Sequence, residues 1–140
     1  MLDRDVVTTK MAVIDRCLSR IQEVRGERRE ELLPIDVEDI TALNLQRAVQ
    51  AAIDLATHVV SAEGYGTPDS AAGVFTLLEQ RGVIDQSLAG RLRKMVGFRN
   101  IAIHDYQAVD PDIIESILDR HLDDLRSLGT RITNFFRLFR

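Results

Sequence analysis

The sequence of 140 residues contains no tryptophan, and aromatic residues make up only 5% of it. Aliphatic side chains must therefore fill most of the core, which favours helices. A single cysteine, Cys17, excludes an internal disulfide and a cysteine-based zinc site. The uninterrupted apolar stretches are only a few residues long, so a transmembrane helix is excluded as well.

Other absences concern the location and charge of the protein. The first residues are charged and no apolar segment follows them, so no signal peptide is visible and we expect a cytoplasmic protein. The net charge of −4 gives no support to a non-specific nucleic-acid binder, although a local basic site stays open. With 45% hydrophobic and 29% charged residues, the composition is typical of a folded chain. The length predicts a single domain over residues 1–140.

Alternating β-branched runs, the usual signal of strands, are missing, whereas apolar residues recur three or four positions apart along the whole chain. This spacing predicts about five helices, over residues 4–24, 36–62, 69–81, 85–104 and 110–135. We expect Asp36, Asp85 and Asp110 to cap helix N-termini and Gly82 to end the third helix. The short connections predict an all-α antiparallel bundle.

The residues that could carry chemistry are concentrated in one segment. Arg99, Asn100, His104 and Tyr106 lie within eight positions of an otherwise apolar run. Residues 86–104 include four basic residues and no acidic one, which predicts a local positive region that attracts phosphate. The three histidines show no metal-ligand spacing, and no phosphate-binding loop motif is present, so we expect neither a metal nor a cofactor.

Helix geometry constrains how this segment can act. At ~100° per residue, Arg99 and His104 are about 140° apart on a straight helix. They meet around one phosphate only if the helix ends or bends near His104, or if two chains contribute to a composite site. From the residues alone, structural hydrogen bonds at a helix end are the commoner role of such a pair. We expect His58 to be a core or interface histidine and His121 to lie on the surface.

In the segment 97–106, Arg99 is followed directly by Asn100, and after four intervening residues by His104-x-Tyr106. This pattern resembles the signature of the HepT-like toxins of the HEPN superfamily, and the resemblance extends to residues 44–54 and 77–96. It implies an all-α, HEPN-like homodimer that cleaves RNA without a metal ion, as the toxin of a bacterial toxin–antitoxin pair. It also implies that Arg99 and His104 are catalytic, that Asn100 supports them or contacts RNA, and that a minimal nucleotidyltransferase antitoxin of the MntA type transfers AMP to Tyr106.

The residue types suit that chemistry. Attack of the RNA 2′-hydroxyl on the adjacent phosphorus needs a base, an acid and positive charge, and histidine and arginine supply these at neutral pH. In a symmetric dimer, one His104 can act as the base and the other as the acid. Two alternatives stay open: a non-catalytic subunit that presents a nucleotide or substrate to the transferase, and a helical interaction module in which Arg99 and His104 are structural.

Overall fold

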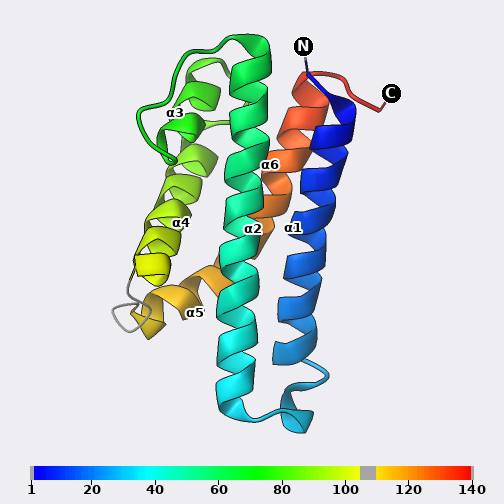
Figure 1. Cartoon of the computed structure of the whole chain (residues 1–140), viewed down its shortest axis with the longest axis vertical. Coiled ribbons are helices and arrows are strands. Elements are labelled where there is room, and N and C mark those ends of the chain that lie inside the picture. The colour runs from blue at the N-terminus through cyan, green and yellow to red at the C-terminus, as the bar shows by residue number, and fades with distance from the viewer. Residues whose placement is uncertain (1, 105–109, 140) are drawn as a thin grey trace.

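The computed structural model describes residues 2–104 and 110–139, and every regular element in these ranges is helical (Figure 1). The elements are α1 (Arg4–Arg25), a 3-10 turn η1 (Arg29–Glu31), α2 (Pro34–Glu63), α3 (Gly73–Gln80), α4 (Gln86–His104), α5 (Pro111–Arg120) and α6 (Leu122–Phe135). The all-α fold is therefore confirmed, with six α-helices in the described ranges where the apolar spacing predicts five. None of these helices is both long and apolar enough to cross a membrane.

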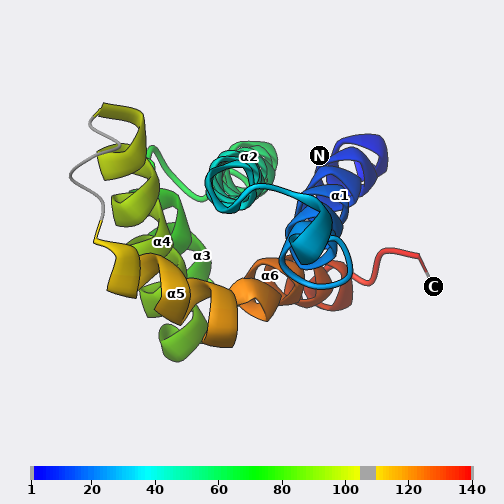
Figure 2. The same cartoon turned by 90° about the horizontal axis from the view of Figure 1, so that it is seen from below.

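The antiparallel pair α1–α2 forms the long side of the bundle, and the turn η1 connects the two helices (Figure 1). Ala48, Ala52 and Ala56 are fully buried on α2. Their small side chains let neighbouring helices approach closely. Seen from below, α2 lies between α1 on one side and α4 on the other (Figure 2), and it contacts both of them. One buried apolar cluster includes residues from all six α-helices.

Two of the expected helix starts are confirmed. The backbone N–H of Leu88 donates to a carboxylate oxygen of Asp85 at 2.8 Å, and that of Asp112 donates to Asp110 at 2.9 Å. These bonds satisfy donors that the first turn of a helix leaves unpaired. At the end of α3, Gly82 has a φ of +75°, the left-handed conformation that suits glycine after a helix.

The helix start expected at Asp36 is wrong. α2 begins at Pro34, and Leu33 takes the capping position without a side-chain hydrogen bond. Proline has its φ already set to a helical value and lacks the N–H that would be unpaired there, so it begins the helix two residues before Asp36. Asp36 instead lies in the first turn, where its charge is favourable to the helix dipole.

The helix predicted over 110–135 is divided in two at His121, whose φ is −127°. The break lets α5 run obliquely across one end of the bundle while α6 runs alongside α1 (Figures 1 and 2). His121 is half-buried, and its Nδ1 lies 3.2 Å from a carboxylate oxygen of Asp124. The expected surface histidine is therefore only partly exposed. The apolar spacing continues through the helix break at His121 and does not reveal it.

Candidate functional site

Arg99 lies on α4 and is half-buried against α2. Its Nη1 donates to Oε1 of Gln50 on α2, and its Nη2 donates to Oδ1 of Asn100 at 2.6 Å. Its Nε is buried and has no hydrogen-bond partner within the described ranges. Both acceptors are neutral amides, so they fix the guanidinium without compensating its positive charge.

Gln50 connects Arg99 to more distant residues. Its Nε2 donates to Oδ1 of Asp54 at 2.8 Å, and Oδ2 of Asp54 accepts from Nζ of Lys10 at 3.1 Å. A continuous chain of polar side chains therefore runs from α4 across α2 to α1. Sequence reasoning missed Gln50 as part of the site. The only available signal was a polar pair four residues apart on one helix face, which is common on helix surfaces.

His104 is the last residue of α4 and is exposed. The helix continues unbroken from Gln86 to His104, so five residues separate His104 from Arg99 by ~140° around the axis and about 7.5 Å along it. The structure therefore does not direct the two side chains of one chain to the same point. It brings Asn100 to Arg99 instead.

The face of α4 that carries His104 is uncovered. Gly97, Ile101 and His104 are spaced four and three residues apart, which places them on one side of the helix. All three are exposed, and Ile101 retains 49% of its accessible surface. Ile103, which precedes His104 in the chain and points to another side of the helix, retains 56%. Two large apolar side chains are thus exposed next to the motif histidine.

Tyr106, the expected site of AMP transfer, lies outside the described residues, and so does its neighbour Asp105. Their expected roles stay predictions from the sequence.

The positive region expected over 86–104 is partly wrong. Nε and Nη2 of Arg91 donate to the two carboxylate oxygens of Asp124 on α6 at 2.8 and 3.1 Å, and Nη1 of Arg93 donates to Glu79 on α3 at 3.1 Å. The bond to Asp124 raises the pKa of Arg91 above its ordinary value. Acidic residues on other helices thus compensate two of the four charges and leave Lys94 and Arg99.

His58 has a structural role. Its Nε2 accepts a hydrogen bond of 2.9 Å from the backbone N–H of Asp3, the residue that caps α1. This bond connects α2 to the start of α1, as expected for a core or interface histidine. Within the described ranges, no group of three or more histidine, cysteine, aspartate or glutamate side chains has an arrangement that could hold a metal ion.

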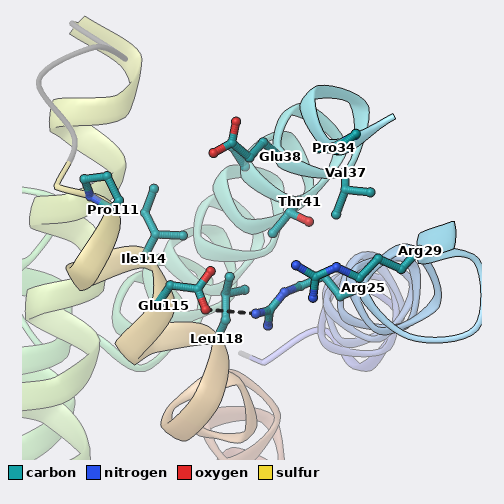
Figure 3. Close-up of a pocket in the computed structure, with 11 residues that line it drawn as sticks. Arg25, Arg29, Pro34, Val37, Glu38, Thr41, Pro111, Ile114, Glu115 and Leu118 are labelled. Carbon is teal, nitrogen blue, oxygen red and sulfur yellow. Dashed lines mark hydrogen bonds and ion pairs between the residues drawn. The ribbon is translucent and has the colours of Figure 1, made fainter. Parts of the chain in front are cut away.

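A cavity of about 680 Å³ lies between α1, α2 and α5 (Figure 3). Its lining includes two arginines and two glutamates, and Arg25 forms an ion pair of 3.0 Å with Glu115. The formal charges of this lining balance, so it has no particular attraction for phosphate. Neither Arg99 nor His104 is among its lining residues.

Comparisons with known proteins agree on one family. Residues 14–132 match the family described as "Ribonuclease HepT-like". The mRNA nuclease HepT of Shewanella oneidensis is 42% identical over 86% of this chain and 90% of its own length. The tRNA nuclease HepT of Aphanizomenon flos-aquae is 26% identical over 76% of this chain and 74% of its own. A solved structure, the tri-AMPylated HEPN toxin of Shewanella oneidensis in complex with MNT antitoxin, superimposes with a TM-score of 0.85 at 40% identity, covering 93% of this chain and 98% of that one.

Proposed function

The chain belongs to the HepT-like ribonuclease family and is a nuclease toxin, and we propose that Arg99 and His104 carry out its cleavage of RNA. The observation that carries this proposal is the guanidinium of Arg99. Two neutral amides, those of Gln50 and Asn100, hold it in place on the helix that ends in the exposed imidazole of His104. A fixed, uncompensated cation near a group able to transfer protons is what phosphodiester cleavage requires.

The active site is composite, formed by two copies of the chain. The ~140° between Arg99 and His104 on an unbroken helix prevents one protomer from directing both side chains at one phosphate. The exposed face of Gly97, Ile101 and His104 supplies the apolar surface through which a second copy packs. A symmetric dimer supplies two arginines and two histidines, and the composite site requires that the His104 of each protomer reaches the Arg99 of its partner.

The reaction needs only these side chains. The His104 of one protomer takes the proton from the ribose 2′-hydroxyl, whose oxygen attacks the adjacent phosphorus. The bond from phosphorus to the 5′-oxygen breaks, and the other His104 gives its proton to that leaving oxygen. Arg99 stabilises the negative charge of the phosphorane with its planar guanidinium. The products are a 2′,3′-cyclic phosphate and a 5′-hydroxyl.

The partner that controls this activity is a minimal nucleotidyltransferase antitoxin of the MntA type, which transfers AMP to the hydroxyl of Tyr106. Support comes from the solved relative, an AMPylated toxin in complex with an MNT antitoxin. Tyr106 is two residues from His104 in the sequence, so an AMP unit on it adds bulk and negative charge close to the motif. That charge competes with RNA phosphate for Arg99.

Expression without the antitoxin tests the function. The wild-type chain should arrest bacterial growth and degrade cellular RNA, whereas His104→Ala should do neither while accumulating to the same level. Arg120→Ala, a change at an exposed arginine on α5, is the control and should behave as the wild type. Intact RNA and normal growth with the wild-type chain would instead favour the non-catalytic binding subunit.

A further inference from the structure

A second cavity, of about 340 Å³, lies between α1 and α2 and differs from the first in its charge. Its lining includes three cations, one carboxylate and two amides, contributed by Lys10, Arg16, Arg47, Asp54, Asn44 and Gln50. The formal charge of this lining is thus +3 − 1 = +2. In a chain with a net charge of −4, such a local excess of positive charge requires an explanation.

Two of these cations have no acidic partner. The one carboxylate of the lining, Asp54, is already bound to Lys10 at 3.1 Å and accepts a hydrogen bond from Gln50. Among the described residues, Arg16 and Arg47 take part in no ion pair.

The acidic residue next to Arg16 in the sequence is also engaged, because Asp15 pairs with Arg126 at 3.0 Å. On α2, the positions three and four residues from Arg47 are Leu43, Asn44, Gln50 and Ala51, none of which is acidic. Among the described residues, both guanidinium groups are thus left without an ion-pair partner.

The charges of both arginines act on the same residue of the cavity lining, Cys17. Cys17 is buried, and burial raises the pKa of its thiol above the ordinary value. The positive charges of Arg16 and Arg47 oppose this increase. One arginine is on α1 and the other on α2, so only the packing of the two helices brings them together.

The cavity is next to the proposed catalytic arginine. Gln50 lines the cavity and also accepts the hydrogen bond from Nη1 of Arg99. The side chain of Gln50 therefore connects the cavity of Arg16 and Arg47 to Arg99.

We propose that this cavity is a phosphate subsite in which Arg16 and Arg47 bind the backbone of single-stranded RNA beside the phosphodiester that is cleaved. The proposal rests on the ribonuclease function proposed above. Guanidinium groups bind phosphate oxygens through paired N–H bonds, and the amide of Asn44 at the same cavity can hydrogen-bond a ribose hydroxyl. The larger cavity beside α5 does not suit this ligand, because its two arginines face two glutamates.

The test compares two double variants that lose the same charge. Arg16→Gln/Arg47→Gln removes the subsite, and Arg4→Gln/Arg120→Gln removes two exposed arginines that do not line the cavity. Binding is measured with a 2′-O-methyl RNA oligonucleotide, which lacks the attacking hydroxyl and stays intact. The subsite variant should bind about tenfold more weakly than the control. Its slope of log affinity against log salt should be shallower by about 0.7, since the two arginines bind one phosphate and each phosphate contact to a single strand contributes ~0.7.

Cleavage rates of a dinucleotide and of a longer RNA then show whether the loss is confined to substrates long enough to occupy the subsite. A dinucleotide has one phosphate, which occupies the site of Arg99, so both double variants should cleave it as fast as the wild type. The longer RNA should lose about tenfold in kcat/KM with the subsite variant only. Binding and salt slopes equal to those of the control would overturn the subsite, whether or not the wild type cleaves RNA. A change in oligomeric mass of the subsite variant, measured by light scattering, would also overturn it and assign this surface to contacts between copies of the chain.

Discussion

At the scale of single residues, the arginines of α4 differ in their hydrogen-bond partners. Arg91 and Arg93 are bound to carboxylates on other helices, whereas Arg99 is bound to two amides. An ion-paired arginine must exchange its partner before it can bind a phosphate. Arg99 is held in place yet keeps its charge, which is the form in which a guanidinium stabilises a phosphorane.

Replacing either motif residue should abolish most of the activity without unfolding the chain. His104→Ala removes a proton-transfer group, and we expect kcat to fall ~10²- to 10⁴-fold. Arg99→Ala removes charge stabilisation, and a loss of ~10²- to 10³-fold is expected. Cleavage by the purified proteins should be followed on a labelled RNA in the presence of EDTA. Wild-type rates from His104→Ala, with circular dichroism confirming its fold, would reject the assignment.

Gln50 should act only through Arg99. Gln50→Ala removes the acceptor that holds Nη1, so the guanidinium loses orientation but not charge. We expect kcat to fall by about tenfold, the effect of one hydrogen bond of ~1.4 kcal/mol to a charged group. In the Arg99→Ala background the same change should have no further effect, which a double-mutant cycle measures. Additive losses would show that Gln50 contributes independently of Arg99.

At the scale of elements, an ion pair between Arg91 and the buried carboxylate of Asp124 connects α4 to α6. Asp124 is 9% exposed and accepts two hydrogen bonds from Arg91, at 2.8 and 3.1 Å. The same carboxylate lies 3.2 Å from Nδ1 of His121, at the break between α5 and α6. One acidic side chain thus connects the helix that carries the motif with the two helices that follow it.

Removing Arg91 should destabilise the fold. Arg91→Ala leaves the buried carboxylate of Asp124 without its main partner, at a cost of about 2 kcal/mol, a moderate value because solvent reaches part of Arg91. Urea denaturation should show this as a lower midpoint at an unchanged slope. Arg120→Ala, at an exposed position on α5, serves as the matched control and should shift the midpoint little. An equal shift in both variants would contradict the role of the ion pair.

At the scale of the whole molecule, the proposed composite site requires a second copy of the chain, because α4 continues unbroken from Arg99 to His104. Arg99 faces α2, while His104 shares an uncovered face with Gly97 and Ile101. In this proposal, a single chain presents half of the site. Two chains packed through this face complete the site and bury apolar side chains that are otherwise in water.

The dimer can be tested on that face. The wild-type chain should scatter light as a species of twice 15.8 kDa. Ile101→Asp places a charge in the contact, because Ile101 is 49% exposed in the single chain, and should shift the equilibrium towards monomer. Cleavage should fall in parallel with the dimer fraction. Phe139→Asp changes an exposed apolar residue near the C-terminus and is the control. A fully active monomeric variant would refute the composite site.

Regulation by the antitoxin also involves a second protein, and it too can be tested. Co-expression with a nucleotidyltransferase of the MntA type should add one or more AMP units to Tyr106, each visible as a mass increment in intact-protein spectra. Peptide mapping identifies the site, with Tyr65, the other tyrosine of the chain, as an internal control. Tyr106→Phe should keep the fold and escape inhibition. AMP on Tyr65 in place of Tyr106 would contradict the proposal.

The sequence by itself determined the helical class, the helix starts at Asp85 and Asp110, and the motif. Apolar spacing and local caps are properties of neighbouring residues, so the capping roles of Asp85 and Asp110 follow from the residues around them. The capping preference of aspartate also predicts that α2 starts at Asp36, and this start is wrong because Pro34 has the stronger local effect.

Only the tertiary structure decided which positive charges are not bound by acidic residues and so remain available to a ligand. Arg91 meets Asp124 across 33 positions, and Arg93 meets Glu79 across 14, so the positive region expected on α4 is partly compensated. Arg16 and Arg47, on two different helices, also have no ion-pair partner among the described residues. Contacts of this kind depend on the rotation of each packed helix about its axis, and helical periodicity alone does not specify which side chains then face one another.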